Sequence, residues 1–428
     1  MDKPLQKVLI LTYYWPPSGG AGVQRWVKFS QYLQQFGYQP VVVTVDSEKA
    51  SYPLRDDSLV EEVSRIEVVR TATFEPFQLY KKLLGKKEIP YAGFANEAEP
   101  GFIEKVSRFV RGNLFIPDAR KGWNRYALTA ARHLIKKYGI KNLVTTSPPH
   151  STQLMGLKLK SEFDLNWIAD LRDPWTDIYY YPLLYHSRWA AATDEKWEKK
   201  VLQQADKVVV VSTSIKKLYA AKIKQEEAAK IRVIPNGYDE KDFSEVVTRR
   251  KDVFTITYTG TVAANYHLEG FFNVLHALSD IPLLLRFVGR VAEKYKNLIR
   301  SLKLEDKILF VPHVSHAEAI RYMVSSDLLL LAIPDVPDNA GILTGKLFEY
   351  LASGVPVLGV GPVEGDAAAI LRECHAGIMV DYSDQQTMKA FVQEKIAASA
   401  SGHENPPPGR CFRYSRKSLT REMVRLFK

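Results

Sequence analysis

The chain has 428 residues and a formal net charge of +11. This length exceeds the size at which a single hydrophobic core usually stops growing, so two domains are expected, and the basic excess favours anionic partners. No apolar run approaches the roughly 20 residues that span a bilayer, and no signal-peptide region follows Met1, which argues against an integral membrane protein. Two cysteines, Cys374 and Cys411, are too few for a disulfide framework, which predicts a reducing, cytoplasmic location.

The first βαβ unit begins at the N-terminus. Residues 7–12 form an apolar run typical of a buried parallel strand, and a helix and a second strand at 40–45 follow. The loop between the first strand and the helix contains Gly19, Gly20 and Gly22. It lies at the carboxyl end of the strand, where doubly wound sheets bind ligands, and glycines let a backbone approach a substrate. A tight turn alone is the other interpretation.

Residues 76–125 interrupt the alternation of strands and helices. They hold more basic than acidic residues, interleaved with aromatic residues. This composition fits an interfacial surface that meets anionic lipid or a lipid-linked acceptor. A solvated loop with a few core anchors would have the same composition, so both interpretations stay open.

Two later strands end in polar residues. The strand at 141–146 is followed by His150, and the strand at 167–171 leads into Arg172 and Asp173. An acid, a base and a cation at such strand ends are well placed to act in a cleft. His150 could instead be a capping or core histidine, and Asp173 an N-cap before Pro174.

The pattern of strand, loop and helix then repeats in a second half. A polar passage at 239–252 is predicted to be a linker, and an amphipathic helix is expected at the C-terminus. The repeat predicts an α/β protein with two doubly wound domains that face each other across a cleft. Further strands are expected at 207–212, 231–234, 253–259, 283–288, 307–311 and 327–331 and near Val357.

The stretch from Thr344 to Val357 predicts a helix, a glycine stop and a buried strand. A helix start presents unpaired N–H groups and the positive end of a dipole to a phosphate. Lys346 and Glu349 are three positions apart and should project from one face. They suit a nucleotide diphosphate, with the lysine at the phosphates and the glutamate at the ribose hydroxyls. An ordinary surface ion pair is the alternative.

Three motifs together resemble the GT-B retaining glycosyltransferases of family four, in a divergent branch. They are Gly19-Gly20 after the first strand, the sequence 233–237 at mid-chain, and Lys346 to Glu349 leading into 353–357. The resemblance implies two Rossmann-like domains. It assigns 1–238 to the acceptor side, with 76–125 as an insertion, 239–413 to the donor nucleotide, and 414–428 to a C-terminal helix that crosses back.

The resemblance also implies an activity. The family transfers a sugar from a nucleotide diphosphate sugar to a hydroxyl acceptor, with retention and without a bound metal or another cofactor. We expect a UDP-sugar donor, a saccharide or lipid-linked acceptor, and a hexosyltransferase-like role in cell-surface polysaccharide or glycolipid synthesis. The expected location is cytoplasmic, in peripheral contact with the anionic inner face of the membrane, and no nucleic acid partner is expected.

Residue roles follow from the same resemblance. Glu349 would hold the ribose, Lys346 and Arg290 the diphosphate, and Gly19 and Gly20 the donor from across the cleft. His150, Arg172 and Asp173 are the candidate catalytic residues, and the last two lie where the family often keeps a histidine that faces the reacting sugar. The remaining donor-binding candidates are Thr344, at the helix start, and Gly341, in the loop before it.

The sequence departs from the family pattern at two positions. Gly341 stands eight positions before Glu349, where the family commonly has a glutamate that contacts the sugar. Its loop could serve the sugar through backbone N–H groups, and the donor sugar stays open. Thr261 follows Gly260 where the family often has an arginine, so one phosphate contact is missing or is supplied by Arg290.

Three other functions would explain part of the sequence. A nicotinamide dehydrogenase would explain Asp46 at the end of the second strand, but the loop at 19–22 lacks the G-x-G-x-x-G spacing. A sugar-nucleotide epimerase of GT-B fold would share the donor chemistry without needing a large acceptor surface. A catalytically inactive sugar-nucleotide-binding protein is the third alternative.

Overall fold

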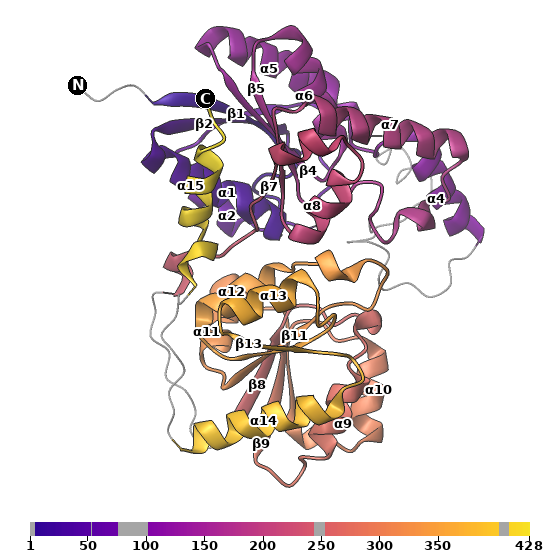
Figure 1. Ribbon diagram of the computed structural model, residues 1–428, viewed down its shortest axis with the longest axis vertical. Coiled ribbons are helices and arrows are strands. Elements are labelled where there is room, and N and C mark those ends of the chain that lie inside the picture. Colours follow the sequence, from indigo (N-terminus) through magenta and orange to yellow (C-terminus); the bar gives the residue numbers. More distant parts are fainter. Residues whose placement is uncertain (1–4, 53, 76–101, 244–252, 402–410) are drawn as a thin grey trace. The chain divides into compact units, whose positions relative to one another are not determined.

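The structure is a computed structural model that describes residues 5–52, 54–75, 102–243, 253–401 and 411–428 (Figure 1). The chain divides into two compact units. Unit 1 comprises Met1–Asn236 and Arg416–Lys428, and unit 2 comprises Gly237–Ser415. Each unit is a parallel β-sheet with helices on both faces, so the predicted α/β fold with two doubly wound domains is confirmed.

The described part of unit 1 contains a seven-stranded parallel sheet of order β3-β2-β1-β4-β5-β6-β7. Its central strands are buried on both faces, which explains why they are continuous apolar runs rather than alternating ones. The strands are β1 (Gln6–Leu11), β2 (Tyr38–Val45), β3 (Glu67–Thr71), β4 (Asn142–Ser147), β5 (Asn166–Leu171), β6 (Lys207–Val210) and β7 (Ile231–Val233).

Two hydrophobic clusters cover the two faces of this sheet, because alternate strand residues point to opposite sides. Leu9 and Leu11 pack with α5, α6, α7 and α8, whereas Val8 and Ile10 pack with α1, α2 and the C-terminal helix α15 (Figure 1). The helices are α1 (Ala21–Leu33), α2 (Ser58–Glu62), α4 (Phe102–Leu114), α5 (Asn124–Tyr138), α6 (Ser151–Glu162), α7 (Arg188–Gln204), α8 (Thr213–Ala220) and α15 (Arg416–Val424).

Unit 2 is built in the same way around a six-stranded parallel sheet of order β10-β9-β8-β11-β12-β13, counted over its described residues. The strands are β8 (Phe254–Thr259), β9 (Leu283–Val288), β10 (Ile308–Val311), β11 (Leu328–Ala332), β12 (Val357–Val360) and β13 (Gly377–Val380). Helices α9 (Glu269–His276), α10 (Glu293–Ser301) and α14 (Gln385–Ala400) cover one face, and α11 (His316–Val324), α12 (Gly345–Ser353) and α13 (Asp366–Glu373) cover the other.

The strand order reverses once in each sheet, and this position predicts where ligands bind. In unit 1 the reversal lies between β1 and β4, and in unit 2 it lies between β8 and β11. Ligands of open α/β sheets bind beyond the carboxyl ends of the strands at such a point. The loops after these strands are therefore where functional residues should gather.

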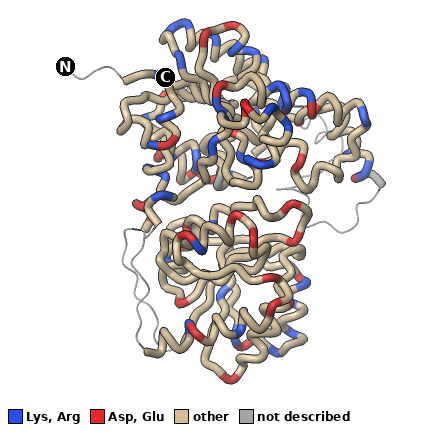
Figure 2. Tube along the Cα trace, in the orientation of Figure 1, with Lys and Arg blue, Asp and Glu red and all other residues tan. Residues whose placement is uncertain are grey.

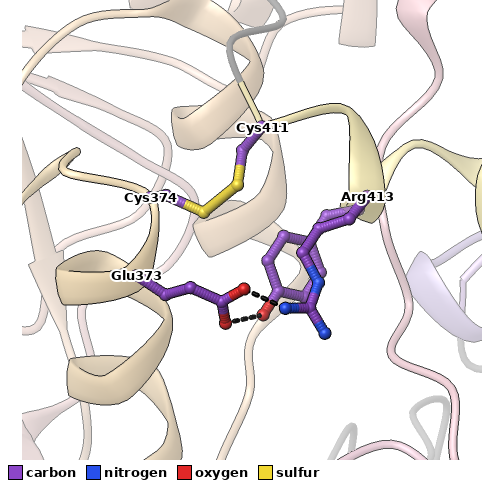
Figure 3. The surroundings of a disulfide bond; sticks show 5 residues. Glu373, Cys374, Cys411 and Arg413 are labelled. Carbon is purple, nitrogen blue, oxygen red and sulfur yellow. Dashed lines mark hydrogen bonds and ion pairs between the residues drawn. A yellow bond between two sulfur atoms is a disulfide. The ribbon is translucent and has the colours of Figure 1, made fainter.

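The structure corrects the interpretation of the cysteines. Cys374, directly after α13, and Cys411 form a disulfide bond with 5.8 Å between their Cα atoms (Figure 3). Beside it, Glu373 accepts hydrogen bonds from Arg413 and from the Tyr414 hydroxyl, the latter at 3.0 Å. The argument from the small number of cysteines to a reducing compartment therefore no longer applies.

Two other expectations meet the limits of the described residues. Of the predicted linker, residues 239–243 belong to unit 2, where Phe243 is buried in its core, and 244–252 lie outside the described residues. Of the insertion at 76–125, residues 76–101 also lie outside, and the rest carries α4. Within the described ranges, no helix has the length and apolar character to cross a membrane.

Candidate functional site

The start of α12 has the features of an anion site. Thr344 is its N-cap residue, yet no side chain caps the helix, and the Thr344 Oγ1 atom is buried without a hydrogen-bond partner. Gly354, in the left-handed conformation, ends the helix. An uncapped helix start beside a buried, unpartnered hydroxyl is suited to the oxygen atoms of a phosphate.

Lys346 lies in the first turn of α12 and is held by β8. Its Nζ donates a 2.9 Å hydrogen bond to the Tyr258 hydroxyl and lies 4.8 Å from the centre of that ring. The Tyr258 hydroxyl in turn donates to the Thr261 carbonyl at 2.9 Å, and burial raises its pKa far above the usual value. Because the phenol accepts only one of the three N–H groups of an ammonium, Lys346 has two further N–H donors for a ligand.

Glycines after β8 and β9 let the neighbouring loops come close. A Cβ on Gly260 would lie 2.8 Å from Lys346 Cε, and a Cβ on Gly289 would lie 2.4 Å from the Gly260 carbonyl oxygen. Both glycines have positive φ angles, which other residues rarely adopt. Gly260 therefore makes room for the lysine, which gives a structural reason for a glycine at this position.

Glu349 lies three positions after Lys346, as predicted. Its side chain is 18% exposed, and its Oε1 lies 2.9 Å from Nε2 of His316 on the neighbouring helix α11. Gly341 lies in the short helical turn η8 (Asn339–Gly341) just before Thr344. Arg290 is exposed, and its carbonyl accepts from the Val262 amide at 2.8 Å, which places it beside the Gly260 loop. The structure thus places Lys346 against the Gly260 loop at the strand-order reversal of unit 2, with Arg290 on the adjoining loop after β9.

In unit 1, the glycines of the first loop have local packing reasons. The Gly19 amide donates to the Leu54 carbonyl at 3.0 Å, and a Cβ on Gly19 would lie 2.9 Å from Cβ of Asp56. Gly20 is the N-cap residue of α1 with φ 104°. A Cβ on Gly22 would lie 1.5 Å from Arg172 Nη1, so this glycine makes room for the arginine. These contacts account for the glycines without a ligand.

The ends of β4 and β5 bring three predicted residues together. Arg172 donates to the carbonyls of Ser147 at 3.0 Å and Pro148 at 3.1 Å. Asp173 is half-buried, and burial raises its pKa against the opposing effect of Arg172. No helix begins at Pro174, so the N-cap interpretation of Asp173 is wrong.

His150 is the N-cap residue of α6, but its side chain does not cap that helix. Its ring stacks on Trp175 with 4.8 Å between ring centres, and its Nδ1 atom is buried without a partner. Burial, followed by the charge of Arg172, lowers its pKa to about 3, so the imidazole is neutral near pH 7. A neutral histidine beside Arg172 can accept a hydrogen bond from a hydroxyl group, but its low pKa makes it a weak proton acceptor.

Several residues of these sites were not found from the sequence. His316 is distant in sequence from Glu349, and Asp194, which accepts from Trp175 Nε1 at 2.8 Å, lies on a separate helix. Burial raises the pKa of Asp194 to about 7. No local pattern marks such partners, since only the fold brings them together. Among the described residues, no three His, Cys, Asp or Glu side chains gather as they would to hold a metal ion.

Two doubly wound units in one chain are the architecture of the GT-B glycosyltransferases. Two family models match: Glycosyltransferase Family 4 over residues 19–242 and Glycosyl transferases group 1 over residues 239–398. The first match covers more than half of the sequence, and the chain belongs to Glycosyltransferase Family 4. The resemblance found in the sequence is thereby confirmed.

Solved structures share the fold at low sequence identity. Sucrose-phosphate synthase from Thermosynechococcus elongatus matches with a TM-score of 0.66 at 16% identity, over 98% of each chain. A glycosyltransferase from Rickettsia africae has a TM-score of 0.63 at 15% identity, over 99% of this chain and 98% of that one. The Anabaena protein HepE in complex with UDP-glucose has a TM-score of 0.59 at 12% identity, over 98% of each. Among curated proteins, none matches the sequence.

Proposed function

We propose that this glycosyltransferase moves a sugar from a nucleotide diphosphate sugar, with a UDP-sugar favoured, to a hydroxyl group of a saccharide or lipid-linked acceptor, with retention of configuration. The arrangement at α12 is the observation that carries the proposal. The helix start is uncapped, the Thr344 hydroxyl has no partner, Lys346 is fixed by Tyr258, and Glu349 follows one turn later. These groups match a diphosphate next to a ribose.

In this proposal the leaving diphosphate is stabilised by preorganised groups of unit 2. The helix start and Lys346 place positive charge where the departing phosphate develops negative charge, which lowers the barrier most when the groups are already in position. Arg290 adds a second cation from the neighbouring loop, and backbone N–H groups near Gly341 bind the sugar. Transfer then needs no metal ion and no cofactor.

Unit 1 supplies the acceptor side. His150 and Asp173 lie at the ends of adjacent strands, with Arg172 between them in sequence and hydrogen-bonded to the end of β4. The acceptor hydroxyl attacks the anomeric carbon from the face that the phosphate leaves, which gives retention. We assign the activity to cell-surface polysaccharide or glycolipid synthesis on the cytoplasmic side of the membrane.

The test is turnover of a panel of nucleotide sugars by the purified protein. UDP release that depends on an added saccharide or lipid-linked acceptor, with a product of unchanged anomeric configuration by NMR and unchanged rates in EDTA, is the expected result. Conversion of the nucleotide sugar into an isomer without any acceptor would instead identify an epimerase. Binding without turnover across the whole panel would identify an inactive sugar-nucleotide-binding protein.

A surface of unit 1 supports contact with an anionic membrane. Helix α4 exposes Val106, Phe109 and Leu114, the last with 73% of its surface accessible, and Trp189 at the start of α7 is 69% exposed. We call these four residues the α4 surface. Lys105 and Arg188 are exposed beside it, and Figure 2 shows further Lys and Arg positions in the region of α4 and α7. Apolar side chains rimmed by cations fit the interface of an anionic bilayer.

Liposome co-sedimentation tests this contact. Phosphatidylglycerol vesicles should retain the protein, and salt should weaken retention because surface attraction is screened within about 8 to 10 Å. Replacement of Phe109 and Leu114 by serine should reduce retention. Equal binding to neutral vesicles, or a dimer that the double variant dissociates, would show that the α4 surface serves another purpose.

A further inference from the structure

The carboxylate assigned to the ribose has a partner on a separate helix. His316 Nε2 lies 2.9 Å from Glu349 Oε1, and the two side chains are 34% and 18% exposed. Helices α11 and α12, which carry them, pack through buried residues that include Met323 and Leu351. The pair is therefore held by a helix interface and is not a chance contact of two mobile surface side chains.

The backbone at His316 is fixed independently of Glu349. His316 is the first residue of α11, and Ser315 before it forms a capping box with Glu318. The Ser315 hydroxyl accepts from the Glu318 amide at 3.3 Å, and the Glu318 carboxylate accepts from the Ser315 amide at 3.1 Å. The imidazole thus projects from a turn whose conformation its own hydrogen bonds determine.

The chemistry of the pair leaves room for a ligand. An ionised carboxylate only accepts hydrogen bonds, so Nε2 must be the donor. One lone pair of Glu349 Oε1 is then used, whereas no other residue that the structure describes bonds to Oε2 or to the second lone pair of Oε1. A glutamate with three rotatable bonds loses side-chain entropy when it binds a ligand, and a partner that orders it beforehand reduces this cost.

We infer that His316 is a positioning residue, which orients the Glu349 carboxylate so that it accepts hydrogen bonds from both hydroxyls of the ribose of a nucleotide diphosphate. The inference rests on the proposed function, since it assumes that Glu349 binds the ribose. A fixed carboxylate gains binding free energy from its hydrogen bonds to both hydroxyls, whereas a rotating carboxylate gains less from the second one. His316 therefore favours a ribonucleotide over a 2′-deoxyribonucleotide.

Calorimetric titration of the full chain tests this assignment with UDP, 2′-deoxy-UDP and inorganic pyrophosphate. In His316→Ala, UDP affinity should fall roughly tenfold, in keeping with the loss of a hydrogen bond to a charged group. The preference for UDP over 2′-deoxy-UDP should shrink, and pyrophosphate affinity should stay unchanged. His316→Gln, which keeps a donor, should recover part of the preference. His313→Ala is the matched control, since His313 is exposed in the loop that precedes α11.

The outcomes separate this inference from the proposed function. If Glu349→Ala leaves UDP affinity unchanged, the donor site itself is misplaced. If Glu349→Ala weakens UDP binding while His316→Ala keeps the full preference for UDP, the donor site stands and the role of His316 is wrong. A double variant that binds UDP no more weakly than Glu349→Ala alone would confirm that His316 acts through the carboxylate.

Discussion

Unit 1 contains a fully buried and paired carboxylate at a strand end, Asp170, whereas unit 2 presents a half-buried carboxylate on a helix, Glu349. Asp170, at the end of β5, and Arg25 form an ion pair at 2.9 Å in which both side chains are fully buried. Trp26 and Thr146 also donate to the Asp170 carboxylate, at 2.7 and 2.8 Å. In unit 2, Glu349 has one protein partner on one oxygen and solvent access.

The two carboxylates differ in how many of their lone pairs the protein uses, and this number distinguishes a structural charge from one that can bind a ligand. A carboxylate whose lone pairs are all used by the protein has none left for a ligand, and removal of one partner leaves an uncompensated buried charge. A carboxylate with unused lone pairs at a sheet's strand-order reversal is available for binding. Asp170, two residues before Arg172, therefore has a structural role in unit 1, whereas Glu349 keeps the lone pairs that the proposed ribose site requires.

Replacement of Asp170 should change the free energy of unfolding of unit 1 more than any other substitution considered. Asp170→Ala should destabilise unit 1 by about 3 to 5 kcal/mol, because Arg25 is left buried without its partner. All seven tryptophans lie in unit 1, so urea unfolding followed by tryptophan fluorescence reports on that unit alone. Arg132→Ala, which removes a partly exposed ion pair with Glu162 in the same unit, should cost about 0 to 1 kcal/mol. Similar losses of stability in the two variants would show that the buried pair matters no more to the fold than a partly exposed pair.

Asp173→Asn should lower turnover roughly a hundredfold, a typical contribution of a group that moves a proton. Its affinity for the donor should not change, since the proposed donor contacts lie in unit 2. Steady-state kinetics and UDP titration of the same preparation measure both quantities. A variant whose tryptophan fluorescence shows an unfolded unit 1 would point to a structural role for this carboxylate.

Lys346→Ala and Glu349→Ala should each weaken UDP binding roughly ten- to a hundredfold, because hydrogen bonds to charged groups are worth about 1.5 to 3 kcal/mol. Both side chains lie off the apolar face of α12, so the fold should survive. Lys296→Ala is a matched control, since Lys296 pairs with Glu293 at the same three-residue spacing on α10. Unchanged UDP affinity in both α12 variants would show that they form an ordinary surface pair.

The sequence predicted most of the strands and the residues of α12, because both depend on local patterns. Buried parallel strands are apolar runs, and a three-residue helical spacing places Lys346 and Glu349 on one face. Strands β3 and β13 were missed, since each is only partly buried and lacks a long apolar run.

Residues that depend on distant partners could not be predicted. The hydrogen bond from His316 to Glu349, the ion pair of Arg25 with Asp170 and the disulfide of Cys374 each join segments that are far apart in the chain. Their formation follows from strand order and helix packing, which local propensities do not contain. The function of a side chain at a strand end is therefore decided by what the fold places opposite it.

The pH dependence of the stability of unit 1 should show the smallest change. The pKa of His150 is about 3 in the folded protein, below its ordinary value of 6.5. Between these values the unfolded chain binds a proton that the folded chain does not, so stability is lost as pH falls from about 6.5 towards 3. Asp194 acts in the opposite direction, because its pKa is raised to about 7 and its protonated form is retained on acidification.

A variant isolates the contribution of His150 from that of Asp194. His150→Gln cannot take up the proton, so its loss of stability between pH 7 and pH 5 should be smaller than that of the original protein, as measured by urea unfolding with tryptophan fluorescence. His133→Gln, which changes an exposed histidine of the same unit, should leave the loss unchanged. If both variants follow the original protein, the His150 imidazole titrates normally, and unit 1 keeps its strand-end histidine open to solvent as unit 2 keeps Glu349.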